Sequence, residues 1–147
     1  MGTRLALSDF TREQVAELNR RHGSPLRNEA ELDNFYRLVG GHPYLVRCGL
    51  AALTESAVTL TGMQTQALQE EGPFGDHLLR LRVALQKSPE LTQSMSELLR
   101  GTPINPMENF YRLQSAGYVV GDGKKEGRPR CQLYAMYLTH YLLSAQP

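Results

Sequence analysis

Apolar residues recur every three or four positions along most of the chain, which is the spacing of amphipathic helices. The first such run follows Thr11, whose hydroxyl and the side chain of Gln14 have the spacing of a capping box. The second follows Asn28, a favourable N-cap, and places Leu32 and Phe35 on one stripe. We therefore expect a succession of helices that begin near Thr11, Asn28, Pro43, Thr61, Asp76 and Ser88.

The pattern changes in the last third of the chain. A helix that ends at Ser115 is followed by a strand over 118–120, the turn-rich loop "GDGKKEG", a second strand over 130–133 and a final helix over 134–143. A helix followed by a hairpin with a charged tip is typical of a winged helix. The two helices that precede this segment would complete such a domain.

The break "EEGPFG" separates these two patterns and gives the expected domain boundary. The predicted fold is mainly α, with a helical bundle over residues 1–72. It is followed by a winged-helix domain with one small β-hairpin over residues 73–147. The length of 147 residues accommodates two small domains of this kind.

Charge and cysteine content narrow the classes of function. The chain has 16 basic and 15 acidic side chains, so it lacks the strongly basic balance of a dedicated nucleic-acid domain. Cys48 and Cys131 lie far apart in apolar stretches, which favours buried free thiols over a disulfide or a metal site. We find no signal-peptide core and no apolar run long enough to span a membrane, and we expect a cytoplasmic protein with no membrane partner.

One corner of the predicted bundle holds more glycine and proline than a turn needs. In "LVGGHPYLVR", residues 38–47, Gly40 suits the end of one helix and Pro43 suits the first position of the next. These two roles explain the turn but leave Gly41 and His42 without a function.

Five segments then point to a family when they are taken in order. They are "LSDFTREQVAEL", "LVGGHPYLVR", "GPFGDHLLRL", "LQSAGYVV" and "RCQLYAMYL". Together they resemble the C-terminal part of the bacterial AAA-like ATPase family known notably from cyanobacteria, which is related to the STAND signalling ATPases. The resemblance extends from Leu5 to Leu143 and implies a helical lid followed by a winged helix.

The same resemblance implies a P-loop core that this chain does not contain. No GxxxxGK[ST] motif occurs, and the Gly-Lys pair in "GDGKKEG" is followed by neither Ser nor Thr. Without a phosphate cradle, its lysine and a Mg²⁺ ligand, we expect no ATP hydrolysis and no cofactor in the isolated chain. ATP or ADP with Mg²⁺ is implied for a parent protein whose core lies upstream of Met1 and is the partner of these domains.

The corner is the candidate site in this interpretation. Gly41, His42 and Pro43 are similar to the GxP motif with which the lid of STAND ATPases touches the nucleotide near its base. Glycine permits close approach, and Pro43 presents a flat apolar face at the start of a helix. We predict that these three residues contact nucleotide only when the core is present. The alternative is that the corner only joins two helices.

The predicted wing is the second candidate site. It gathers four basic side chains against Asp122 and Glu126, and wings of this kind contact nucleic-acid phosphates. The four are Lys124, Lys125, Arg128 and Arg130. The expected recognition helix "MENFYRLQS" carries Arg112 as its only base, which argues against nucleic acid as a partner.

Two other groups of residues are explained by helix capping and packing and not by catalysis. Asp76 and His77 are adjacent on a helix and point about 100° apart, so they form no catalytic pair, and Asp76 suits an N-cap. Tyr134, Tyr137 and Tyr141 lie at helical spacing and suit a packing seam, with an exposed interface as the alternative.

The sequence therefore favours a non-catalytic, regulatory lid and winged helix of a signalling ATPase, which couples nucleotide state to conformation or to an unidentified protein partner. A stand-alone winged-helix DNA-binding regulator and a protein–protein adaptor are the alternatives.

Overall fold

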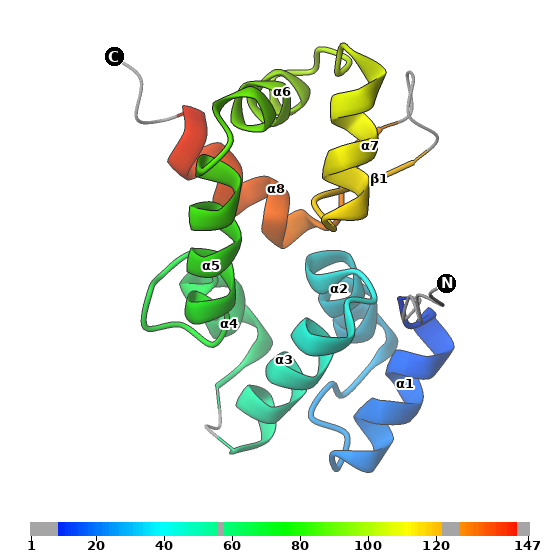
Figure 1. Cartoon of the computed structure of the whole chain (residues 1–147). Coiled ribbons are helices and arrows are strands. Elements are labelled where there is room, and N and C mark those ends of the chain that lie inside the picture. Colours follow the sequence, from blue (N-terminus) through cyan, green and yellow to red (C-terminus); the bar gives the residue numbers. More distant parts are fainter. Residues whose placement is uncertain (1–8, 56–57, 122–126, 144–147) are drawn as a thin grey trace, which may run out of the picture. The chain divides into compact units, whose positions relative to one another are not determined.

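The computed structural model describes residues 9–55, 58–121 and 127–143. Over these residues the chain is mainly α-helical with one two-stranded antiparallel hairpin, so the predicted fold class is confirmed (Figure 1). The elements are α1 (Arg12–Arg21), α2 (Glu29–Val39), α3 (Pro43–Glu55), α4 (Leu60–Gln66), α5 (Gly75–Gln86), α6 (Pro89–Leu99), α7 (Met107–Ser115), β1 (Val119–Val120), β2 (Arg128–Pro129), α8 (Gln132–Leu138) and the π-helical turn η1 (Thr139–Leu143).

The chain divides into two compact units that interleave where they meet in the sequence. Unit 1 comprises residues 1–67 and 72–74, and unit 2 comprises residues 68–71 and 75–147. The boundary predicted after residue 72 falls within the segment where the chain passes between the units. Unit 1 holds α1 to α4, and unit 2 holds α5 to η1 with the hairpin.

Side-chain caps begin the first two helices of unit 1 where the sequence predicts them. At α1 the Thr11 hydroxyl accepts from the Gln14 N–H at 3.2 Å, and the Gln14 side chain accepts from the Thr11 N–H at 2.9 Å. At α2 the Asn28 side chain accepts from the Glu31 N–H at 2.9 Å. Each cap satisfies a backbone donor that the helix itself leaves unpaired.

A buried amide closes the loop between α1 and α2. The side chain of Asn19, 8% exposed, donates to the Leu26 carbonyl at 3.0 Å and accepts from the Leu26 N–H at 2.9 Å. The core beneath it is aliphatic and aromatic, with Phe35 and Phe74 fully buried. The Cys48 thiol donates to the Pro73 carbonyl at 2.9 Å, which fixes residues 72–74 to α3.

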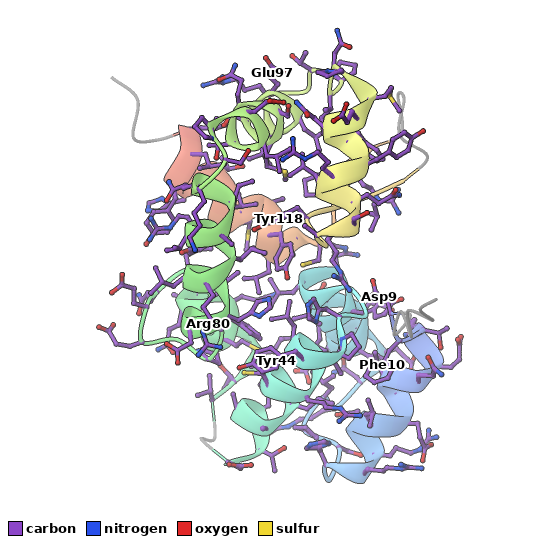
Figure 2. The ribbon with its side chains drawn as sticks, viewed as in Figure 1. Asp9, Phe10, Tyr44, Arg80, Glu97 and Tyr118 are labelled. Carbon is purple, nitrogen blue, oxygen red and sulfur yellow. The ribbon has the colours of Figure 1, made fainter. Side chains whose placement is uncertain are left out.

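Tyrosine side chains link the elements of unit 2. The Tyr118 hydroxyl donates to the Leu81 carbonyl at 2.7 Å and so joins the residue before β1 to α5 (Figure 2). The Arg82 guanidinium donates to the Tyr137 hydroxyl at 3.0 Å and lies 4.1 Å from the centroid of the Tyr141 ring. Tyr134 and Tyr137 are buried, so the predicted packing seam is confirmed for these two residues, whereas Tyr141 is only half-buried.

The order of three helices, hairpin and final helix in unit 2 is compatible with a winged helix. The hairpin pairs Val119 with Pro129 and Val120 with Arg128. The prediction of a second strand over 130–133 is wrong, because the strand lies earlier and residue 132 already belongs to α8.

Two predicted helix starts also need correction. The cap of α4 is Thr59, whose hydroxyl accepts from the Gly62 N–H at 2.9 Å, and not Thr61. Asp76 lies in the first turn of α5, which begins at Gly75, and is therefore not the N-cap. In both cases the helix begins before the polar residue that the sequence predicted as its start.

Candidate functional site

The corner between α2 and α3 begins with a glycine in the left-handed region. Gly40 has a φ of +64°, and its N–H donates to the Tyr36 carbonyl at 2.7 Å. The N–H of His42 donates to the Val39 carbonyl at 3.3 Å. Only glycine adopts such a φ without strain, so the predicted helix stop at Gly40 is confirmed.

His42 is the N-cap of α3. Its Nδ1 accepts from the Tyr44 N–H at 3.2 Å, and its carbonyl accepts from the Val46 N–H at 2.8 Å. Pro43 occupies the first helical position, where its missing N–H costs no hydrogen bond. The imidazole of His42 is thereby held at the start of a helix.

Gly41 lies against the chain that enters α1. Its carbonyl accepts from the Phe10 N–H at 2.8 Å. A Cβ at position 41 would overlap the carbonyl oxygen of Phe10 and lie 2.7 Å from the Phe10 backbone nitrogen. The Phe10 carbonyl accepts in turn from the Tyr36 hydroxyl at 3.1 Å. Close packing against the Phe10 backbone therefore explains why position 41 is glycine, without any ligand.

The structure brings the three predicted residues together and adds two that the sequence did not single out. Phe10 and Tyr36 complete the corner, and the ring of Phe10 lies 5.9 Å from the guanidinium carbon of Arg47. Tyr36 lies on the apolar stripe of α2, where a hydroxyl group needs an acceptor. That requirement was the one signal in the sequence that could have drawn attention to it.

The corner offers surfaces for binding. The Tyr44 side chain is 53% exposed, and His42 and Pro43 are half-buried. These groups can stack on a flat ring or exchange a hydrogen bond with it.

The wing residues fall into two groups. Lys124 and Lys125 lie outside the described residues. Arg128 is exposed on β2, and Arg130 follows that strand with its guanidinium 3.5 Å from the Gly117 carbonyl. The Arg130 N–H donates to the Tyr118 carbonyl at 3.0 Å. Arg130 thus lies where the hairpin joins the body of unit 2, and its predicted contact with phosphate stays a prediction.

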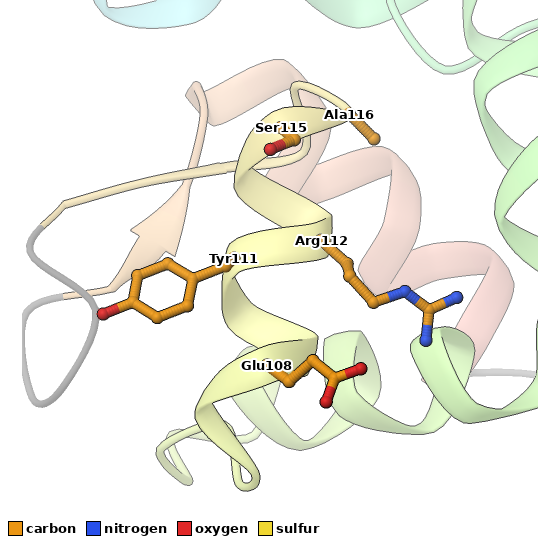
Figure 3. Close-up of a pocket in the computed structure, with 5 residues that line it drawn as sticks. All are labelled: Glu108, Tyr111, Arg112, Ser115 and Ala116. Atoms are coloured by element: carbon orange, nitrogen blue, oxygen red, sulfur yellow. The ribbon is translucent and has the colours of Figure 1, made fainter.

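The exposed face of α7 forms a shallow hollow (Figure 3). Tyr111 is 54% exposed there, and the Arg112 guanidinium lies 3.7 Å from the Glu90 carboxylate. The hollow is lined by Glu108, Tyr111, Arg112, Ser115 and Ala116. Arg112, the basic residue of this helix, lies next to Glu90, and Glu108 lies on the same face. This charge pattern is unfavourable for binding the phosphates of a nucleic acid.

His77 is a packing residue. Its Nε2 lies 2.8 Å from the Tyr134 hydroxyl, and the two rings stack at a centroid distance of 6.0 Å. Burial lowers the pKa of His77 below its usual range, and the charges of Arg130 and Arg80 lower this pKa further. The imidazole is therefore neutral at pH 7 and joins α5 to α8.

Metal and thiol chemistry find no support among the residues that the structure describes. No three His, Cys, Asp or Glu side chains in that part of the chain are grouped to hold a metal ion. Cys131 is buried as predicted, whereas Cys48 is only half-buried. Burial raises the pKa of the Cys48 thiol, which makes it a poorer nucleophile at neutral pH. Among the described helices, none has the length and hydrophobicity to cross a membrane.

Comparisons with known proteins identify the family. No curated protein and no solved structure shows significant similarity to the chain. The model of a family described as AAA-like domain matches residues 1–140. Since this match covers nearly the whole sequence, the chain belongs to the AAA-like domain family.

Proposed function

We propose that this chain is the regulatory part of an ATPase, a lid and a winged helix that respond to the nucleotide held by a P-loop core in the same parent protein. One observation carries the proposal: the chain belongs to an AAA-like family over residues 1–140 and yet has no GxxxxGK[ST] motif. A domain of ATPase descent without a phosphate cradle cannot hydrolyse ATP alone. Its role is then to sense the nucleotide and to pass on its state.

The corner is the part of the chain that we assign to the nucleotide. Gly41 packs the backbone of the corner against Phe10, Pro43 starts α3, and the half-buried His42 accepts a hydrogen bond from the first turn of that helix. Pro43 and His42 would lie against the nucleobase, and the phosphates of the nucleotide with their Mg²⁺ would stay bound to the P-loop core. Contact that differs between ATP and ADP would shift the population of lid conformations.

Unit 2 would transmit that shift to a partner. The exposed face of α7 carries the ring of Tyr111 between the acidic Glu108 and the basic Arg112. This composition suits contact with a protein better than contact with a nucleic acid. Binding to duplex DNA is the rival function. A gel shift at micromolar protein that weakens steeply with salt would favour this rival over our proposal.

The decisive experiment measures nucleotide affinity in a protein that joins this chain to its upstream P-loop core. Pro43→Ala is expected to weaken ADP binding roughly 10- to 200-fold, the range of one lost apolar contact. Pro89→Ala is the matched control, because Pro89 also occupies the first position of a helix. Equal affinity in the Pro43→Ala and Pro89→Ala proteins would contradict the role of the corner.

The reading frame itself provides a second test. A P-loop within a few hundred residues upstream of Met1 is expected from the proposal. A frame without one would overturn it, whatever the affinity of the isolated chain for nucleotides.

A further inference from the structure

Asp9 and Phe10, which we call the strap, precede α1 and belong to no helix. We propose that the strap couples the chain that precedes α1 to the α2–α3 corner, so that displacement of that chain releases the corner. For its biological meaning this inference rests on the proposed function. For its physical content it rests on the contacts of Phe10 alone.

Three successive elements hold Phe10. The Gly41 carbonyl in the corner accepts from the Phe10 N–H at 2.8 Å, and the Tyr36 hydroxyl of α2 donates to the Phe10 carbonyl at 3.1 Å. From α3 the Arg47 guanidinium lies 5.9 Å from the centroid of the Phe10 ring. Figure 2 labels Phe10. The N–H and the carbonyl of its main chain are both paired, which anchors this residue although it lies outside regular structure.

The contact leaves no space between strap and corner. Gly41 is buried, and even a methyl group at this position would overlap the Phe10 carbonyl. The hydrogen bond between the two backbones weakens steeply once they move apart, because it depends on distance and alignment. We therefore distinguish a seated strap from a released one.

The start of α1 directs any displacement onto the strap. The residue after Phe10 is Thr11, whose N–H and hydroxyl are both engaged in the capping box with Gln14. α1 is thereby capped at its N-terminus, and displacement of the strap acts on the bonds that join Phe10 to the corner. Release would free the Gly41 carbonyl beside His42 and Pro43, the residues that we assign to nucleotide.

Amide hydrogen exchange of the 147-residue chain without nucleotide tests the strap. The Phe10 amide is expected to exchange at least about tenfold more slowly than in an unstructured peptide, because it is bonded to Gly41. Tyr36→Phe removes one of the two bonds and should speed this exchange roughly 3- to 10-fold. Tyr111→Phe, which changes an exposed tyrosine of unit 2, should leave it unchanged.

Gly41→Ala is the stronger variant. It should abolish protection of the Phe10 amide and speed exchange at His42, while the Val15 amide in α1 keeps its protection. Unprotected Phe10 in the unmodified chain, or Tyr36→Phe without effect, would overturn the strap. If the Gly41→Ala protein also lost protection in α1, the variant would be generally unfolded. The milder Tyr36→Phe variant would then decide whether Phe10 is held at the corner.

The two proposals fail separately. Slow exchange at Phe10 together with a Pro43→Ala protein that binds ADP normally would refute the nucleotide role and leave the strap. Rapid exchange at Phe10 with weakened ADP binding would refute the strap and leave the nucleotide role.

Discussion

In unit 1 the contact that closes the corner is made by two backbones, whereas in unit 2 tyrosine hydroxyls join α5 to the residue before β1 and to α8. Phe10 lies directly on Gly41, and Tyr118 reaches the Leu81 carbonyl through its phenol. A backbone contact accepts no added atom, while a hydroxyl bridge depends on a single oxygen. The corner should therefore be sensitive to an added methyl group and the Tyr118 contact to a lost hydroxyl group.

The largest effect is expected from adding one methyl group at the corner. Gly41→Ala should lower the free energy of unfolding by about 2–3 kcal/mol, because the overlap with Phe10 is relieved only by moving backbone. Urea denaturation measures this difference. Gly62→Ala is the control, since Gly62 lies in α4 and a Cβ there meets only side-chain atoms, the Thr59 hydroxyl at 3.1 Å and Val58 Cγ1 at 3.5 Å. Equal stability of the two variants would contradict the role of the close backbone contact at the corner.

A smaller effect is expected from removing one oxygen in unit 2. Tyr118→Phe should cost about 1 kcal/mol, since it deletes the hydrogen bond to Leu81 and keeps the buried ring. Tyr111→Phe removes an exposed hydroxyl and should stay within about 0.5 kcal/mol of the unmodified chain. If the Tyr118→Phe protein is as stable as the Tyr111→Phe protein, packing of the buried ring, and not the hydrogen bond to Leu81, holds Tyr118 against α5.

The smallest effect is a dependence on pH that belongs to unit 2. The pKa of His77 is lowered in the folded state, so the unfolded chain binds more protons near and below the usual value of 6.5. The resulting stability is fully present above pH 6.5 and is lost as the pH falls toward the folded pKa. His77→Gln should make the melting temperature less dependent on pH between 7.5 and 5.5. An unchanged or steeper dependence would contradict this assignment.

Local signals were sufficient wherever one residue decides the structure. Thr11 and Asn28 cap their helices, and Gly40 and Pro43 end and begin theirs, as the sequence predicts. Each of these roles depends on one side chain and the backbone within three or four residues. The sequence pattern around α4 contains two threonines that satisfy the same rule, so it could not decide between Thr59 and Thr61.

Long-range contacts could not be predicted in this way. The sequence prediction began the second strand at residue 130, whereas Pro129 lies in β2; it lacks the N–H that a ladder uses, but a two-stranded hairpin has an outer edge where none is needed. Likewise, nothing near Gly41 in the sequence reveals that Phe10 lies against it. The sequence predicted that the corner is special, and the pairing with Phe10 and Tyr36 required the fold.

The interleaved boundary has a consequence for how such domains can be exchanged. Residues 68–71 belong to unit 2 although residues 72–74, with the fully buried Phe74, belong to unit 1. A cut before residue 72 removes a core side chain from unit 1, and a cut after residue 74 removes a segment from unit 2. A single cut in the chain therefore leaves either unit 1 without Phe74 or unit 2 without residues 68–71.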